Sequence, residues 1–105
     1  MDEKKFDIGA EVRAKLLGRV QNEAFHALKD EVYPELAEAL SNWPPMNSAH
    51  EGFAVLAEEV EELWAHVRTK QHARSLPTMR KEAIQVAAMA VRFALEVCSE
   101  ERGRR

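Results

Sequence analysis

The chain has 105 residues, with 15 Lys and Arg against 18 Asp and Glu, and its formal net charge is −3. Such a chain lacks the global positive field that holds DNA or RNA, its single cysteine excludes an intrachain disulfide, and no run reaches the ~20 apolar residues that span a bilayer. We therefore expect one cytoplasmic domain over residues 1–105, with no membrane or nucleic-acid partner and, because its start is charged, no signal peptide.

The composition favours helix. Ala, Glu, Leu, Arg and Lys dominate, whereas the chain has only four Gly and four Pro. We predict an all-α fold in which three or four antiparallel helices form a bundle, the last two being long and paired.

The first predicted segment covers residues 8–40. Its apolar residues follow an imperfect helical period: Val12, Leu16, Val20, Phe25 and Leu28. Pro34 removes a backbone donor and clashes with the preceding turn. We therefore expect Pro34 to break or kink this segment, with one helix to about Lys29 and a shorter one from Tyr33 to Leu40.

The second predicted helix follows a break at residues 42–47, which contain two prolines. Ser48 is the expected N-cap, with Glu51 as its capping-box partner, and the helix is expected to end near Gln71. One broad apolar face runs along it, formed by Phe53, Leu56, Ala57, Val60, Leu63, Trp64 and Val67. We expect Trp64 in the core.

The third predicted helix begins near Pro77 and ends near Glu100, before a frayed basic tail at residues 102–105. Apolar residues cover most of its circumference, as is typical of a helix buried in a bundle or in a subunit interface. We therefore expect a homo-oligomer. Its polar positions share one narrow stripe, formed by Glu82, Gln85, Arg92 and Glu96.

Acidic residues on the last two helices are the candidate chemical site. Glu59 and Glu62 are three positions apart at the edge of the apolar face, and Glu82 and Gln85 repeat that spacing on the polar stripe. Pairs from antiparallel neighbours can converge on one hard cation such as Mg²⁺, which polarises phosphoryl groups and activates water. The alternative is that these glutamates form an ordinary solvated helix face.

Two segments resemble the MazG-like superfamily of all-α nucleotide pyrophosphohydrolases, and are most similar to its small phage-type and bacterial members. They are HEGFAVLAEEVEELWAHV at residues 50–67 and MRKEAIQVAAMAVRFALEV at residues 79–97. The family pattern is EExxE followed by ExxD. It matches Glu58, Glu59 and Glu62, and then Glu82, with Gln85 in place of the final Asp. About half the chain is covered, and residues 1–45 have no recognised motif.

The resemblance implies a fold, an activity and a set of roles. The fold would be a helical dimer or tetramer that hydrolyses a nucleoside triphosphate to a monophosphate and pyrophosphate with Mg²⁺, or with Mn²⁺. Glu59, Glu62 and Glu82 would be metal ligands, and Glu58 would bind a second ion or orient the attacking water. Gln85 keeps a coordinating oxygen but loses one negative charge, so cation affinity should fall. The alternative is a weak or inactive helical oligomer that serves as an interaction or scaffold module.

Basic residues near this pattern are candidates for phosphate contacts. Arg92 lies on the same stripe as Gln85, and Lys81 belongs to a basic cluster at the turn between the two helices. The alternative for Arg92 is an ion pair with Glu96 or Glu82. The alternative for Lys81 and its basic neighbours is that they form an ordinary solvated surface. His66 is a candidate ligand or base, or a simple surface partner of the glutamates.

Overall fold

The computed structural model describes residues 3–99, and every regular element among them is helical. The elements are α1 (Glu3–Ala27), a π-helical turn η1 (Leu28–Val32), α2 (Tyr33–Asn42), α3 (Ala49–Val67), a 3₁₀ turn η2 (Gln71–Ala73) and α4 (Leu76–Glu96). The prediction of an all-α fold is confirmed. The predicted frayed tail at residues 102–105 lies outside the described residues. No helix of residues 3–99 has both the length and the apolar character needed to cross a bilayer.

The α-helix is interrupted before Pro34, close to the predicted bounds: α1 ends at Ala27, α2 begins at Tyr33, and the π-helical turn η1 joins them without a non-helical residue. The Tyr33 N–H donates to the carbonyl of Leu28, five residues back, instead of four as in an α-helix. This wider turn lies where the ring of Pro34 would otherwise meet the carbonyl of Asp30. The prediction of an interruption before Pro34 and of a second α-helix from Tyr33 is therefore confirmed, and the proline lies in the first turn of α2.

The start of α3 is as predicted. Ser48 Oγ accepts a hydrogen bond from the Glu51 N–H (3.1 Å), and the Glu51 carboxylate accepts from the N–H of Asn47 (3.3 Å) instead of that of Ser48. The helix ends at Val67, four residues before the predicted end. Its last turn is capped from the loop, since the Arg74 guanidinium donates to the carbonyls of Val67 and Thr69.

The start of α4 also agrees with the sequence. Ser75 Oγ accepts from the N–H of Thr78 (3.3 Å), and Pro77 occupies the first turn, where its missing N–H leaves no bond unmade. The helix ends at Glu96 and not near Glu100.

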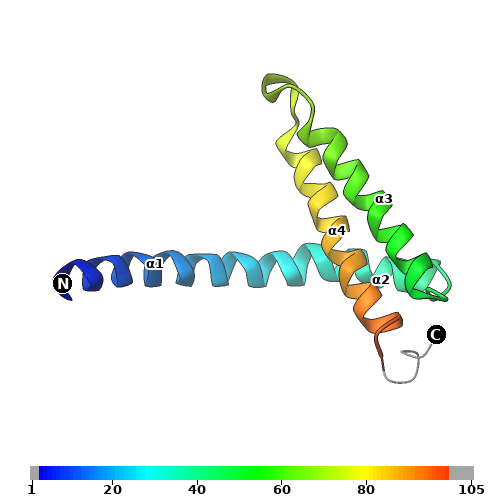
Figure 1. Ribbon diagram of the computed structural model, residues 1–105, viewed down its shortest axis with the longest axis horizontal. Coiled ribbons are helices and arrows are strands. Elements are labelled where there is room, and N and C mark those ends of the chain that lie inside the picture. The colour runs from blue at the N-terminus through cyan, green and yellow to red at the C-terminus, as the bar shows by residue number, and fades with distance from the viewer. Residues whose placement is uncertain (1–2, 100–105) are drawn as a thin grey trace.

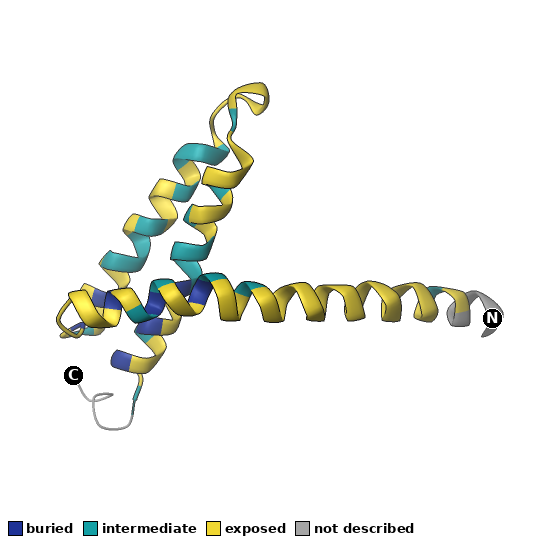
Figure 2. Ribbon diagram, turned by 180° about the vertical axis from the view of Figure 1, so that it is seen from behind, coloured by how far each residue is buried: buried dark blue, intermediate teal, exposed yellow. Residues whose placement is uncertain are grey.

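The helices α3 and α4 form an antiparallel hairpin, and α2 with η1 crosses it near the start of α3 and the end of α4 (Figure 1). The buried residues gather at this crossing (Figure 2). Its apolar members are Val32, Leu36, Ala39, Met46 and Ala88. The crossing therefore fixes α2 against the face of the hairpin that bears Gln85 and Arg92.

The long helix α1 projects away from the hairpin and contacts no described element except η1 (Figure 1). Over residues 8–27 its large apolar side chains are exposed: Ile8, Val12, Leu16, Leu17, Val20 and Phe25. The described part of one chain is thus a paired hairpin with a crossing helix and a free arm. The predicted bundle of three or four antiparallel helices stays a prediction, because among the described residues only α3 and α4 form an antiparallel pair.

Candidate metal site and adjoining cavity

Three carboxylates from α3 and α4 meet on the hairpin, of which Glu59 and Glu82 are half-buried and Glu62 is exposed. Glu59 and Glu62 of α3 and Glu82 of α4 each offer an oxygen, and these oxygens lie within 4.8 Å of one another. The spacing of three residues on α3 places both of its carboxylates toward α4. His66, one turn further along α3, places Nε2 4.0 Å from Glu82 Oε1. This is the arrangement that the two-helix hypothesis requires.

Partial burial and repulsion between neighbouring carboxylates disfavour the ionised form of Glu59. Partial burial raises the pKa of Glu59, and repulsion from Glu62 and Glu82 raises it further. A hydrogen bond shared with Glu62 and the charge of Glu58 act in the same direction. A cation placed among these oxygens would relieve the repulsion, so the donor set is chemically suited to Mg²⁺.

Gln85 lies between two members of the cluster. With its amide nitrogen turned toward them, it donates to Glu59 Oε2 over 3.1 Å and to Glu82 Oε2 over 3.2 Å. If the Gln85 amide oxygen faces Glu59 and Glu82 instead, three acceptor groups face one another. That arrangement is favourable only when a cation or a proton lies among them. The Gln85 amide can therefore act in two ways. Its N–H group can donate to the two carboxylates in the absence of a cation, or its oxygen can serve as a further ligand of a bound cation.

A cavity of about 440 Å³ lies beside the cluster, between α2 and the hairpin. Glu59 and Gln85 belong both to its wall and to the cluster, and Trp43, Val55 and Met89 add apolar surface. Its charged lining residues are Glu35, Glu38, Glu51, Glu58, Glu59 and Arg92. With five carboxylates against one guanidinium, the cavity attracts cations, and it admits a phosphate only together with them.

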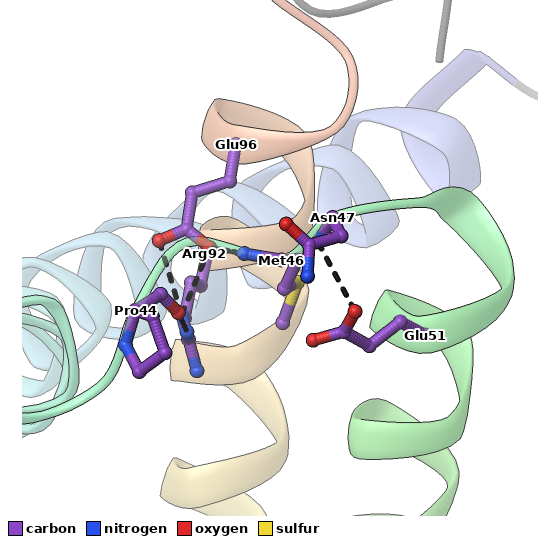
Figure 3. Close-up of polar contacts among 6 residues, drawn as sticks. All are labelled: Pro44, Met46, Asn47, Glu51, Arg92 and Glu96. Atoms are coloured by element: carbon purple, nitrogen blue, oxygen red, sulfur yellow. Dashed lines mark hydrogen bonds and ion pairs between the residues drawn. The ribbon is translucent and has the colours of Figure 1, made fainter.

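The single cation of the cavity wall is held by a buried network (Figure 3). Arg92 Nε donates to Glu96 Oε2 (3.0 Å), and Arg92 Nη2 donates to the carbonyl of Pro44 (2.7 Å). The N–H of Met46 donates to the same Glu96 oxygen (3.0 Å). Arg92 and Glu96 are only 5% and 8% exposed. This pair anchors the loop between α2 and α3 and so shapes the end of the cavity.

The structure separates the candidate residues into two groups. Glu59, Glu62, Glu82 and Gln85 come together, and Glu58 is exposed on the cavity wall beside them. Arg92 makes the ion pair with Glu96 that was the alternative to a phosphate contact. Lys81 is exposed and does not line the cavity.

Two other basic residues near this turn, Arg74 and Arg80, have structural partners. Arg74 caps α3, and Arg80 forms a forked ion pair with Glu31 of η1, with contacts of 3.0 and 2.6 Å. The hydrogen bonds from Arg80 lower the pKa of Glu31. Arg80 therefore ties the start of α4 to the π-helical turn.

Sequence reasoning missed the contribution of α2 to the cavity. Glu35, Glu38 and Asn42 line it, and Trp43 stands exposed at the end of that helix. Their spacing of three and four residues places them on one helical face, which was the available signal. It was not recognised because residues 1–45 have no motif to show which face matters.

Comparisons of this chain with protein-family models, with curated proteins and with solved structures find no match.

Proposed function

We propose that this chain is a nucleoside triphosphate pyrophosphohydrolase that depends on Mg²⁺, or on Mn²⁺, and releases a nucleoside monophosphate and pyrophosphate. The observation that supports the proposal most directly is the meeting of Glu59, Glu62 and Glu82 within 4.8 Å. The adjoining cavity of about 440 Å³ is in the size range of small-molecule sites. The resemblance of residues 50–67 and 79–97 to the MazG-like pattern supplies the reaction class.

The residues present suit such a cation. Glu59, Glu62 and Glu82 would hold it, with the Gln85 oxygen as a neutral fourth ligand. When bound, the cation supplies Lewis acidity toward the phosphates and lowers the pKa of water. An acidic cavity that repels free triphosphate then accepts the cation complex, which gives a physical reason for metal dependence.

The carboxylate on the cavity wall completes the proposed chemistry. Glu58 accepts a proton from water as the water oxygen bonds to the α-phosphorus, and the bond from that phosphorus to the bridging oxygen breaks to release pyrophosphate. Arg92, held by Glu96 and Pro44, keeps the end of the cavity in place and has guanidinium N–H groups beyond the two bonds described. Lys81 keeps only a long-range electrostatic role in this proposal.

The test is pyrophosphate release from a panel of canonical and modified nucleoside triphosphates with Mg²⁺ or Mn²⁺. Glu59→Gln and Glu82→Gln should each lower the rate by more than about 100-fold, since even residues that merely support metal ligands contribute ~10–100-fold. Glu61→Gln is the matched control, because Glu61 is exposed on the same helix and lies outside the cluster. Equal rates for Glu59→Gln and Glu61→Gln would refute the site.

A calorimetric titration with Mg²⁺ examines Gln85 separately. Gln85→Asp restores the missing carboxylate and should tighten binding of the cation, whereas Glu59→Gln should weaken it. Unchanged affinity in both variants would show that the cluster is not the cation site.

A second candidate function is a non-catalytic oligomer that acts as an interaction or scaffold module. It is favoured by Gln85, whose amide can satisfy Glu59 and Glu82 without any cation. The same assay separates the two functions. A chain that binds no Mg²⁺ and hydrolyses none of the triphosphates, but binds the cation with Gln85→Asp, would refute the hydrolase and leave the non-catalytic oligomer as the candidate.

A further inference from the structure

Two carboxylates on the cavity wall have no role in the proposed chemistry. Glu35 and Glu38 of α2 line the cavity, and among residues 3–99 neither has a hydrogen-bond or ion-pair partner. Glu51 on the opposite wall differs from them, because its carboxylate accepts from the N–H of Asn47. Glu35 is also half-buried, so part of its hydration is lost. A ligand that donates hydrogen bonds would satisfy both acceptors.

The floor of the cavity runs along the hairpin away from the acidic cluster. On α4, Gln85 and Arg92 both line it, and their separation of seven residues amounts to about 10 Å along the helix axis. Gln85 belongs to the cluster, whereas Arg92 holds the Pro44 carbonyl just beyond the end of α2 (Figure 3). Trp43, which precedes Pro44, therefore lies toward the end of the cavity that is farther from the proposed cation.

Aromatic and apolar surface in this part of the cavity suits a flat ring. The indole of Trp43 is 65% exposed, and Val55 and Met89 line the floor between the two ends. Stacking on an exposed aromatic side chain favours the binding of any base. Glu38 and Asn42 lie one turn apart on one face of α2, so polar groups border the place where a ring would stack. A second cation site would instead be surrounded by oxygen ligands alone.

We propose that the α2 wall, formed by Glu35, Glu38, Asn42 and Trp43, binds the base of the nucleotide and selects bases with an exocyclic amino group. This inference rests on the proposed function. Cytosine, adenine and guanine present their amino group as a donor, and a carboxylate is a suitable acceptor for it. Uracil and thymine have a carbonyl oxygen where cytosine has its amino group, and carboxylates repel that oxygen. The preferred substrates are therefore triphosphates of amino-bearing bases.

The first experiment measures pyrophosphate release from pairs of triphosphates whose bases differ in an amino group. The pairs are CTP with UTP and GTP with ITP, each with saturating Mg²⁺. A hydrogen bond to a charged group contributes about 10-fold or more in affinity. The value of kcat/KM should therefore be at least about 10-fold higher for the amino-bearing member of each pair.

Glu35→Gln and Glu38→Gln test whether these carboxylates cause the preference. Each should lower kcat/KM for CTP more than for UTP, because a glutamine amide can also donate to the uracil oxygen. Glu61→Gln is the matched control, since Glu61 is exposed outside the cavity, and it should keep the wild-type ratio. A wild-type ratio near one, or a ratio that neither α2 variant changes, would overturn the base preference and leave the hydrolase in place.

A binding measurement decides the proposal even if no triphosphate is hydrolysed. The chain has two tryptophans, Trp43 and Trp64, whose indole N–H resonances can be followed by NMR and assigned with Trp64→Phe. Cytidine and uridine carry no phosphate, so their binding requires no cation. Cytidine should shift the Trp43 resonance with a dissociation constant about 10-fold lower than that of uridine. Equal constants, or no shift at Trp43, would overturn the proposal, whereas selective binding without pyrophosphate release would refute the hydrolase alone.

Discussion

At the scale of single residues, the acidic cluster shows what spacing can and cannot reveal. Glutamates three positions apart on each helix predicted that Glu59, Glu62 and Glu82 would approach one another, and they do so. The partner of Arg92 was left open, because a guanidinium on a polar stripe can face Glu82, Glu96 or a ligand. Only the position of the loop after α2, whose Pro44 carbonyl accepts from Arg92, decides among them.

The raised pKa of Glu59 predicts a pH-dependent gain in stability for Glu59→Gln. The folded state binds a proton at Glu59 more tightly than the unfolded state, so stability falls as the pH rises from the ordinary glutamate range through the raised pKa. The melting temperature of Glu59→Gln should therefore exceed that of the wild type at about pH 7, and the difference should shrink toward about pH 4. Scanning calorimetry across this range provides the measurement.

Glu61→Gln serves as the control, because it removes a charge from the same helix without entering the cluster. Saturating Mg²⁺ should reduce the difference at about pH 7 if the cluster binds the ion, since only the wild type gains from it. A difference between wild type and Glu59→Gln that is independent of pH would contradict the assigned repulsion.

At the scale of elements, local signals predicted helix starts better than helix ends. Ser48 and Ser75 with Pro77 are short-range signals that act within one turn, and both starts agree with the sequence. The end of α3 depends on Arg74, which reaches back from the following loop. Pro34 indicated a break or a kink but not its form, because the wider turn at residues 28–32 has no sequence signature that we recognised.

The close packing of α3 on α4 depends on Gly52. A Cβ built there would lie 2.7 Å from Phe93 Cδ2 and 3.0 Å from Met46 Sδ. Gly52→Ala should therefore destabilise the fold by about 1–3 kcal/mol, although alanine in an open helix position is favoured over glycine by about 0.5–1 kcal/mol. Urea denaturation measures the free energy of unfolding of each variant.

Gly18→Ala on α1 is the contrasting variant, because nothing lies within 4 Å of its added Cβ. It should be neutral or stabilising. Equal effects of the two substitutions would mean that the contact of Gly52 with Phe93 does not limit the packing of the hairpin.

At the scale of the whole molecule, periodicity showed that Phe53, Val60 and Trp64 lie on one apolar face of α3, but not whether another element covers that face. Trp64 was expected in the core, yet it is about half exposed, as are Phe53 and Val60. The polar stripe of α4 instead points inward, where Arg92 and Glu96 are buried as a pair. A helical wheel gives the relative direction of side chains, and the choice of the buried side depends on where α2 crosses.

Large apolar side chains are exposed on α1 and α3, among them Leu16, Phe53 and Trp64. Self-association would cover such side chains, so we predict that thermal stability rises with protein concentration. Association stabilises the folded state but not the unfolded state. The melting temperature should therefore increase steadily over a ~100-fold range of protein concentration. Phe53→Glu should remove most of this dependence, because it replaces a large exposed apolar side chain with a charge. Ala54→Glu adds the same charge at an exposed position of the same helix without removing a large apolar side chain, and it should retain the dependence. A constant melting temperature for the wild type would contradict association through any of its apolar surfaces.

The buried pair of Arg92 and Glu96 has a consequence for how this protein changes over evolutionary time. The pair and the loop that it anchors maintain the framework, while repulsion from the neighbouring glutamates disfavours the ionised form of Glu59. Exchanges among those acidic positions are therefore tolerated by the architecture. Single substitutions at Glu59, Glu82 or Gln85 should therefore alter the charge of this site while the scaffold keeps its shape.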